Sequence, residues 1–217
     1  SQVISADGRL MGTWSRNEHR VFVGYDSIAP ALFDALVATE DVRFYEHSGI
    51  DSRALMRAVV KRGIMGHREA GGGSTITQQL AKQLYSETAE TTMQRLMQKP
   101  IEWVIAVELE RHYTKEEILT LYLNYFDFLH NAVGIKTAAN VYFGKAPKDL
   151  TLNECATLVG MVKNPSYYNP VREPERCRQR RNVVLSQMVK AGTLSEEECS
   201  RLSEEPLKLN FHRVDHK

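Results

Sequence analysis

Apolar residues recur at helical spacing from Ser27 almost to the C-terminus, and this periodicity restricts the fold of the 217-residue chain more than any other feature. Three helices are predicted to begin at Thr114, Thr151 and Ser195, because each of these residues precedes a glutamate by three positions. Gly192 suits the end of the helix that precedes Ser195. The sequence therefore predicts a mostly α protein.

The N-terminal residues have a different pattern. Asp7-Gly8 between two short apolar runs is a hairpin signal, and residues 21–23 form a β-prone run. We therefore divide the chain into three parts: a β or extended segment over residues 1–26, a helical domain over residues 27–205, and a tail over residues 206–217.

Charge and cysteine content exclude some classes of function. Charged residues make up 25% of the chain and the net charge is +1, so we expect no nucleic-acid partner. No apolar window reaches the roughly eighteen residues of a membrane span, and no signal peptide is present. Because the sequence begins at Ser1, we expect a targeting or anchoring segment to have been removed. Cys155, Cys177 and Cys199 form no Cys-x-x-Cys pair and are expected to pack as small apolar residues.

The stretch Ala38–Gly49 contains the first candidate site. A helix predicted upstream places Glu40 and Asp41 at its C-terminal end, where the macrodipole disfavours negative charge. We therefore expect a raised pKa for a carboxylate at this position. If the helix continued for two more turns, Glu40, Phe44 and His47 would share one face. The alternative is an exposed acidic helix end followed by a turn.

A second stretch, Gly71–Gln83, runs from three glycines into a predicted helix. Thr75, Gln79 and Lys82 would line its polar face. A glycine loop at a helix N-terminus offers free N–H groups and a favourable dipole to an anion, and Lys82 would add a full charge. No Gly-Lys-Ser/Thr follows the glycines, so this is not a Walker A loop. The alternative is a flexible linker before an ordinary amphipathic helix.

Together the two stretches resemble the first two motifs of the peptidoglycan glycosyltransferases, glycosyltransferase family 51. The motif Glu-Asp-x-x-Phe-x-x-His-x-Gly is matched by Glu40, Asp41, Phe44, His47 and Gly49. The motif Gly-x-Ser-Thr-Ile-Thr-Gln-Gln is matched by Gly72, Ser74, Thr75, Ile76, Thr77, Gln78 and Gln79. The later motif Lys-x-x-Ile-Leu-x-x-Tyr-Leu-Asn is matched by Lys115, Ile118, Leu119, Tyr122, Leu123 and Asn124. The resemblance extends over nearly the whole chain.

This resemblance implies an enzyme that polymerises lipid II. The 4-hydroxyl of an N-acetylglucosamine attacks C1 of the N-acetylmuramic acid at the chain end, with inversion and release of a polyprenyl diphosphate. Glu40 matches the family's general base, and Lys82 and Lys99 are the candidate cations for the diphosphate. Glu102, assigned with Glu40 to the catalytic pair, is expected to orient these lysines or to hold a divalent ion.

The chain departs from the family in its third motif, Arg-Lys-x-x-Glu. Gln98 stands where the arginine is expected, whereas Lys99 and Glu102 are retained. With one cation fewer at the diphosphate, we expect a stronger dependence on Mg²⁺ or Mn²⁺, with Glu102 as a metal ligand. Pro100 lies within a helical pattern, so a kink or a restart is predicted there.

The residues expected to bind substrate come from all of these motifs. They are Asp41, Phe44, His47, Ser74, Thr75, Gln79, Lys82, Gln98, Lys99 and Asn124. For Asp41 an equally good alternative is anchoring of the loop, and for His47 we favour a role in holding the loop over proton transfer. For Asn124 the favoured alternative, which also applies to Tyr122, is that it fixes the core of the site.

Two further groups of residues bear on membrane contact. A helix predicted from about Ser52 to Ile64 belongs to a segment that mixes apolar and basic residues: Ile50, Leu55, Met56, Ile64 and Met65 with Arg57, Lys61 and Arg62. This segment either faces a membrane or packs its apolar residues inward. The arginines at positions 176, 178, 180 and 181 are expected to form a solvated face, with contact to anionic lipid as the weaker alternative.

The resemblance implies a lysozyme-like, two-lobed helical fold with a small N-terminal β element. The expected partners are lipid II, the nascent glycan, the membrane surface, moenomycin-type inhibitors and other cell-wall synthesis proteins. We expect the outer face of the bacterial cytoplasmic membrane, an N-terminal transmembrane anchor outside this sequence, and a tail leading to a linker or transpeptidase domain. The sequence has no Ser-x-x-Lys or Lys-Thr-Gly, so no acylation by penicillin is expected.

Two other functions remain open at this stage. A lysozyme-type hydrolase would use Glu40 and Glu102 as paired carboxylates. A non-catalytic glycan-binding or assembly module could share the same fold. The glycine loop and the lysines argue against the hydrolase, because a neutral glycan does not need them.

Overall fold

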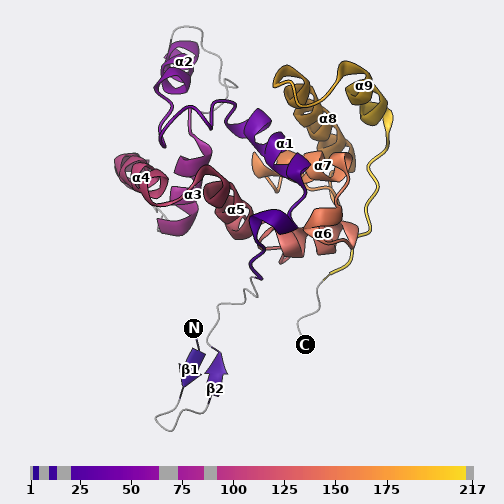
Figure 1. Ribbon diagram of the computed structural model, residues 1–217, viewed down its shortest axis with the longest axis horizontal. Coiled ribbons are helices and arrows are strands. Elements are labelled where there is room, and N and C mark those ends of the chain that lie inside the picture. Colours follow the sequence, from indigo (N-terminus) through magenta and orange to yellow (C-terminus); the bar gives the residue numbers. More distant parts are fainter. Residues whose placement is uncertain (1, 5–9, 14–20, 64–72, 86–91, 214–217) are drawn as a thin grey trace.

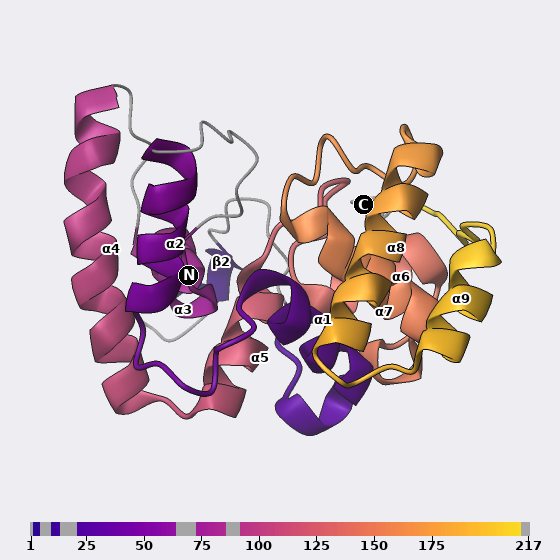
Figure 2. The same ribbon diagram turned by 90° about the horizontal axis from the view of Figure 1, so that it is seen from above.

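The computed structural model describes residues 2–4, 10–13, 21–63, 73–85 and 92–213, and it is a two-lobed assembly of helices (Figures 1 and 2). The smaller lobe contains α2 (Ser52–Gly63), α3 (Ile76–Tyr85) and α4 (Thr92–His112). The larger lobe contains α1 (Pro30–Glu40), α6 (Ile135–Phe143), α7 (Leu152–Val162), α8 (Pro174–Lys190) and α9 (Glu196–Glu204). Helix α5 (Lys115–Tyr125) packs on both α3 and α6 and so joins the lobes. The mostly α prediction is confirmed.

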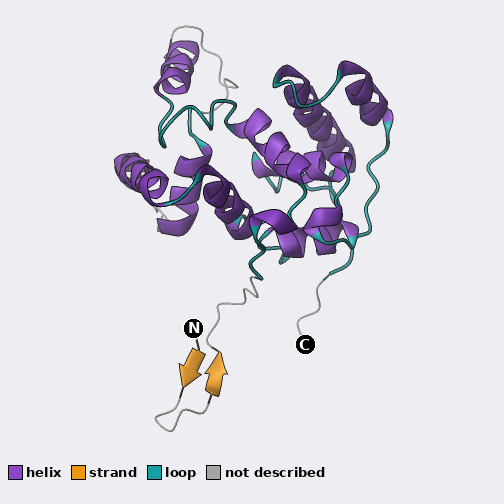
Figure 3. Cartoon of the chain, viewed as in Figure 1, coloured by secondary structure: helices purple, strands orange, loops and turns teal. Residues whose placement is uncertain are grey.

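The predicted small β element is present, set apart from the helices (Figure 3). Strands β1 (Gln2–Ile4) and β2 (Leu10–Thr13) pair antiparallel, whereas the predicted turn at Asp7-Gly8 lies outside the described residues. Residues 21–23 are described and form no strand. Instead, the Asn124 side chain accepts from the N–H of Val23 at 2.8 Å and donates to its carbonyl at 2.9 Å. A side-chain amide thus replaces the strand partner that the β-prone run suggested.

The core of the larger lobe is built around α7. Every residue from Cys155 to Val162 is buried, and α1 and α8 pack on this helix. Gly160 allows α8 to approach closely, because a Cβ there would lie 3.0 Å from Cγ of Arg180. Cys155 and Cys177 are buried free cysteines, and burial raises the pKa of both thiols to about 12. Their predicted role as small apolar residues is confirmed.

The helix boundaries follow the local signals with one exception. Side chains of Thr114, Thr151 and Ser195 each accept from the N–H three residues later, as the capping patterns predict. Gly192, with φ of +81°, follows the end of α8 as predicted. The predicted restart at Pro100 is wrong, because α4 runs unbroken from Thr92 to His112, and the alternative of a kink stays a prediction. Packing of α4 along α3 offsets the cost of the proline.

Two short 3₁₀ helices complete the described elements, η1 (Tyr25–Ser27) and η2 (Pro147–Asp149). They contact each other beside the start of α1, where the N–H of Ala29 donates to the carbonyl of Pro147 at 3.1 Å. No helix among the described residues is long and apolar enough to cross a bilayer.

Candidate active site

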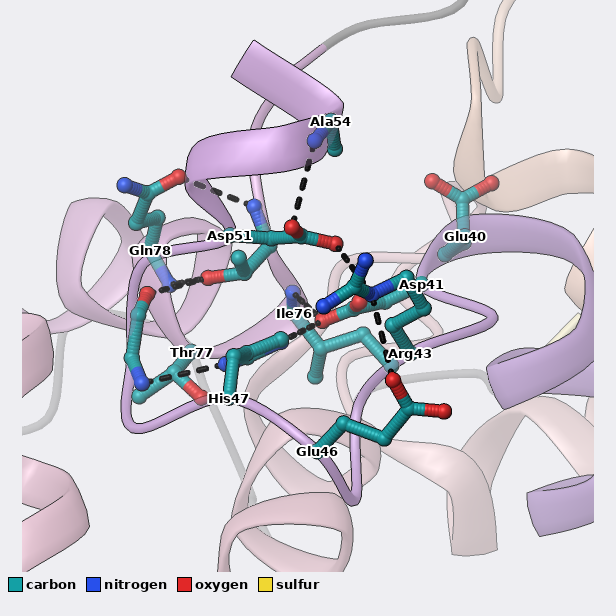
Figure 4. A network of polar contacts seen from close by, with 12 residues as sticks. Glu40, Asp41, Arg43, Glu46, His47, Asp51, Ala54, Ile76, Thr77 and Gln78 are labelled. Atoms are coloured by element: carbon teal, nitrogen blue, oxygen red, sulfur yellow. Dashed lines mark hydrogen bonds and ion pairs between the residues drawn. The ribbon is translucent and has the colours of Figure 1, made fainter. Parts of the chain in front are cut away.

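Glu40 is the last residue of α1, as the sequence predicts, but the helix goes no further. Asp41 leaves the helical conformation with φ of −157° and ψ of 75°, and the chain then turns back through residues 42–48. The condition under which Glu40 would share a helical face with Phe44 and His47 is therefore not met. Figure 4 shows the Glu40 carboxylate pointing away from the polar network that contains Asp41 and His47.

The Glu40 carboxylate is held between the two lobes. Its Oε2 accepts from Nε2 of Gln79 on α3 at 3.3 Å, and its Oε1 lies 3.7 Å from Nη2 of Arg180 on α8. The side chain is only 14% exposed, and this burial raises the pKa of Glu40 above its ordinary value. Gln79, Arg180 and Lys163 oppose the rise in pKa without cancelling it. The predicted direction is confirmed, and burial is its main cause.

Glu40 lines a cavity of about 320 Å³ between the lobes. The end of α1, helix α2, the segment before α3 and one residue of α8 form its walls. The polar lining residues include Glu40, Asp41, Asp51, Arg57, Lys61, Ser74, Thr75 and Gln187. The fold thus brings the first two sequence motifs into one cavity and adds two cations from α2.

Asp41 and His47 join the first motif to the start of α3. Oδ2 of Asp41 lies 2.7 Å from Nε2 of His47 and accepts from the N–H of Ile76 at 3.1 Å. Because Nδ1 of His47 accepts from the N–H of Gly49 at 3.0 Å, the ring proton belongs on Nε2 and points at Asp41. Both side chains are under 9% exposed. These contacts support the loop-holding alternative for both residues.

The side chains of Thr75 and Gln78 cap the start of α3. The Thr75 N–H donates to Oε1 of Gln78 at 2.9 Å, and Oγ1 of Thr75 accepts from the N–H of Gln78 at 3.1 Å. Oγ1 of Thr75 also donates to the carbonyl of Gly49 at 2.7 Å. Together with the Asp41 contact, these bonds occupy three backbone donors at the place where an anion site is predicted. Asp41 is itself an anion bound there.

Gly49 is required at the end of the first motif. Its φ of +106° is unfavourable for other residues, and a Cβ would lie 2.9 Å from the carbonyl oxygen of Ala106 on α4. Next to it, Nζ of Lys115 donates to the carbonyl of His47 at 2.7 Å and lies 4.3 Å from the centroid of the Phe44 ring. The later motif at the start of α5 therefore supports the loop of the first motif.

Gln79 is oriented by a buried tyrosine. The hydroxyl of Tyr122 donates to Oε1 of Gln79 at 2.8 Å, which turns the NH₂ group of Gln79 toward Glu40. Burial raises the pKa of Tyr122 well above its ordinary value, so this hydroxyl keeps its proton. Asn124 is 4% exposed and bonds Val23 and Thr120, and Phe44 is fully buried. Their contacts are with the protein interior, and direct contact with substrate stays a prediction.

The predicted diphosphate residues lie elsewhere on α3 and α4. Nζ of Lys99 lies 3.1 Å from Oε2 of the buried Glu102, while Lys82 is exposed and Gln98 is partly buried. None of these four described residues lines the Glu40 cavity. The pairing agrees with the expectation that Glu102 orients a lysine, and the binding roles stay predictions.

The surroundings of Glu102 do not fit a preformed metal site. Within the described part of the chain, no three histidine, cysteine or acidic side chains are grouped closely enough to hold an ion. Glu102 offers one carboxylate, and its Oε2 pairs with Lys99. The dependence on Mg²⁺ or Mn²⁺ stays a prediction without structural support.

The arginines of α8 correct one expectation from the sequence. Arg181 is 1% exposed and donates to the carbonyls of Leu202 and Glu205 at the end of α9, and Arg178 also binds carbonyls there. Arg180 turns to Glu40 instead. The expected solvated face is wrong, because two of these arginines satisfy the open end of α9. Nothing in the sequence separates Arg180 from its neighbours.

A model of the transglycosylase family matches residues 7–189. The chain belongs to this family. It is 41% identical over 211 residues to penicillin-binding protein 1A of Escherichia coli K12, covering 97% of this chain and 24% of that protein. It is 42% identical over 207 residues to penicillin-binding protein 1A of Aquifex aeolicus VF5, covering 95% of this chain and 28% of that protein.

A solved structure confirms the fold. The crystal structure of penicillin-binding protein 1A from Haemophilus influenzae superposes with a TM-score of 0.54 at 26% identity, covering 98% of this chain and 21% of that one. The lysozyme-like helical fold and the peptidoglycan glycosyltransferase class expected from the motifs are thus confirmed at the level of the family. The chain spans about a quarter of the length of these relatives.

Proposed function

We propose that this domain polymerises lipid II into glycan strands, with Glu40 as the general base and undecaprenyl diphosphate as the leaving group. The observation that carries the proposal is the position of Glu40, a shielded carboxylate on the wall of a polar cavity between two lobes. Burial raises the pKa of Glu40 toward the operating pH, which favours proton abstraction in the transition state.

The chemical step requires one base and one stabilised leaving group. Glu40 takes the proton of the 4-hydroxyl of N-acetylglucosamine as its oxygen forms a bond to C1 of N-acetylmuramic acid. The bond from C1 to the diphosphate oxygen breaks on the opposite face, and its electron pair leaves with the diphosphate. The anomeric centre inverts, and the leaving group needs no proton.

The charge of the diphosphate requires cations near the cavity. Arg57 and Lys61 of α2 line it together with Glu40, although the sequence suggested membrane contact for them. We propose that they bind the diphosphate, because fixed cations at the leaving group lower the barrier. Lys82 and Lys99 remain proposed contacts for the same group.

The proposed dependence of activity on a divalent ion is tested separately. The polymerisation rate is measured against chelator concentration for wild type and for Gln98→Arg.

A hydrolase is the second candidate, and the arrangement of carboxylates disfavours it. A glycosidase needs two carboxyl groups facing one glycosidic bond, about 5–10 Å apart. Glu102, the residue that a hydrolase would pair with Glu40, does not line the described wall of the cavity and is paired with Lys99. The two other carboxylates on that wall are engaged by the protein: Asp41 by His47 and the N–H of Ile76, and Asp51 by Arg43 and the N–H of Ala54. The non-catalytic alternative has no specific observation in its favour.

We propose that an exposed apolar face of α4 contacts the membrane. Four apolar side chains on one face of this helix are 59–73% exposed: Met93, Met97, Ile101 and Val104. A stripe of this kind suits the interface of a bilayer that holds lipid II. Of the segment suggested by the sequence, Met56 on α2 is 62% exposed, whereas Ile64 and Met65 lie outside the described residues.

The cellular setting follows from the substrate. A lipid II polymerase acts at the outer face of the bacterial cytoplasmic membrane, and a membrane anchor preceding this sequence is part of the proposal. The nascent glycan, moenomycin-type inhibitors and other cell-wall synthesis proteins are the proposed partners.

Fluorescent lipid II in detergent micelles tests the function directly. We expect the wild-type domain to convert it into glycan polymers that lysozyme digests. Release of fragments from preformed glycan without polymer formation would indicate the hydrolase. Binding of lipid II with neither reaction would indicate a binding module, and either result would overturn the proposal.

A further inference from the structure

Arg180 is fixed more firmly than a surface arginine. Its side chain is 12% exposed, and its Nε donates to the carbonyl of Gly160 on α7 at 3.3 Å. The guanidinium carbon lies 5.6 Å from the centroid of the Tyr168 ring. With the backbone of α7 and this ring beside it, the guanidinium is directed at Oε1 of Glu40.

Its neighbours on α8 serve a different purpose. Arg178 and Arg181 bind carbonyls at the end of α9, and Arg176 stacks on the Tyr167 ring at 4.0 Å. Arg180 alone of these four is paired with the proposed base. A role in closing the end of α9 therefore does not explain Arg180.

We propose that Arg180 is a positioning residue for glycosyl transfer, which holds Oε1 of Glu40 while Gln79 of the opposite lobe holds Oε2. The proposal rests on the proposed function of Glu40 as the base. A carboxylate with both oxygens fixed presents one orientation to the incoming hydroxyl. The partners come from α8 and α3, so the orientation of the base depends on both lobes.

The charged groups around Glu40 determine how its titration responds. Burial raises the pKa of Glu40, Asp41 adds to the rise, and Gln79, Arg180 and Lys163 lower it. The neutral hydroxyl of Tyr122 acts through Gln79. Arg180 is directly ion-paired to the carboxylate, so its removal leaves burial less opposed. The base should then stay protonated to a higher pH.

Three variants separate this role from a structural one. Arg180→Gln removes the charge, Arg180→Lys retains it, and Arg176→Gln, one turn earlier on α8, is the matched control. We expect the acid limb of kcat/KM for polymerisation to move to higher pH in Arg180→Gln. On that limb the rate should fall roughly tenfold for every pH unit by which the limb moves. Arg180→Lys should recover much of the loss, and Arg176→Gln should match wild type.

A titration of Glu40 itself gives a readout that does not depend on activity. With ¹³C-carboxyl glutamate, the Glu40 signal is assigned by its loss in Glu40→Gln. Its pKa should be higher in Arg180→Gln than in wild type and close to wild type in Arg180→Lys. An unchanged pKa in Arg180→Gln, or an Arg180→Lys protein whose Glu40 titrates well above wild type, would overturn the inference. A higher Glu40 pKa in an Arg180→Gln domain whose wild-type parent cannot polymerise lipid II would uphold the pairing and reject the proposed function.

Discussion

Glu40 is buried, and its polar partners do not fully offset the effect of this burial on its pKa. Its side chain is 14% exposed, with Gln79 at one oxygen and Arg180 at the other, and its pKa is still raised. A raised pKa in the folded state means that the native protein binds more protons here than the unfolded chain does. The contribution of Glu40 to stability therefore falls as the pH rises through its folded-state pKa.

Replacement of Glu40 by glutamine should stabilise the domain at neutral pH. The amide keeps the shape of the carboxyl group and removes the cost of a buried charge. We expect a higher Tm than wild type at pH 7. For a chain of this size, Tm rises by about 2–4 °C for each kcal/mol gained in the free energy of unfolding. Near pH 4 we expect little difference. Calorimetry at both pH values measures it. A lower Tm at pH 7 would show that the pairing with Arg180 outweighs burial.

The loop after α1 depends on contacts made by other helices. Asp41 binds the start of α3, Lys115 of α5 binds the carbonyl of His47, and Gly49 lies against α4. Helices α3, α4 and α5 therefore hold the loop that follows Glu40 in place. The most deeply buried residues of the first motif therefore help to position this loop.

Gly49→Ala should loosen this loop. The new Cβ would meet the carbonyl oxygen of Ala106 at 2.9 Å, at a φ of +106° that alanine rarely adopts. We expect a loss of roughly 1–3 kcal/mol in the free energy of unfolding, measured by urea denaturation. Gly24→Ala is the control, because a Cβ at Gly24 has no neighbour within 4 Å. Equal stability of the two variants would contradict the assigned contact.

The two lobes give the domain a cavity at their junction, and α4 gives the smaller lobe an exposed apolar face. The proposed bilayer contact on α4 and this cavity are the two features that a substrate anchored in the membrane would require.

Charges on the stripe of α4 should weaken membrane binding. We expect Met97→Glu with Ile101→Glu to reduce sedimentation with anionic phospholipid vesicles several-fold, because two apolar side chains proposed to enter the bilayer are replaced by charges that the anionic surface repels. Both positions are more than half exposed, so the circular dichroism spectrum should not change. Val183→Glu on α8, at 42% exposure, is the control in the larger lobe. Equal loss in both proteins would place the membrane face elsewhere.

Local signals predicted most of the fold, because caps, glycines and apolar spacing act over a few residues. The starts of α5, α7 and α9 and the position of Glu40 at the end of α1 follow from such signals. Contacts between distant segments were not predictable in this way. Arg180 reaches Glu40, and Asn124 replaces a strand partner of Val23, only because the chain folds back on itself.

A paired measurement on Glu40→Gln tests whether Glu40 is the base of lipid II polymerisation. Polymerisation rate and lipid II affinity are measured on wild type and variant under the same conditions. We predict a loss of roughly 10²–10⁴-fold or more in rate, with affinity nearly unchanged, since the amide retains size and hydrogen bonding but cannot accept the proton. Polymer formation by the folded variant at near wild-type rate would mean that Glu40 is not the base.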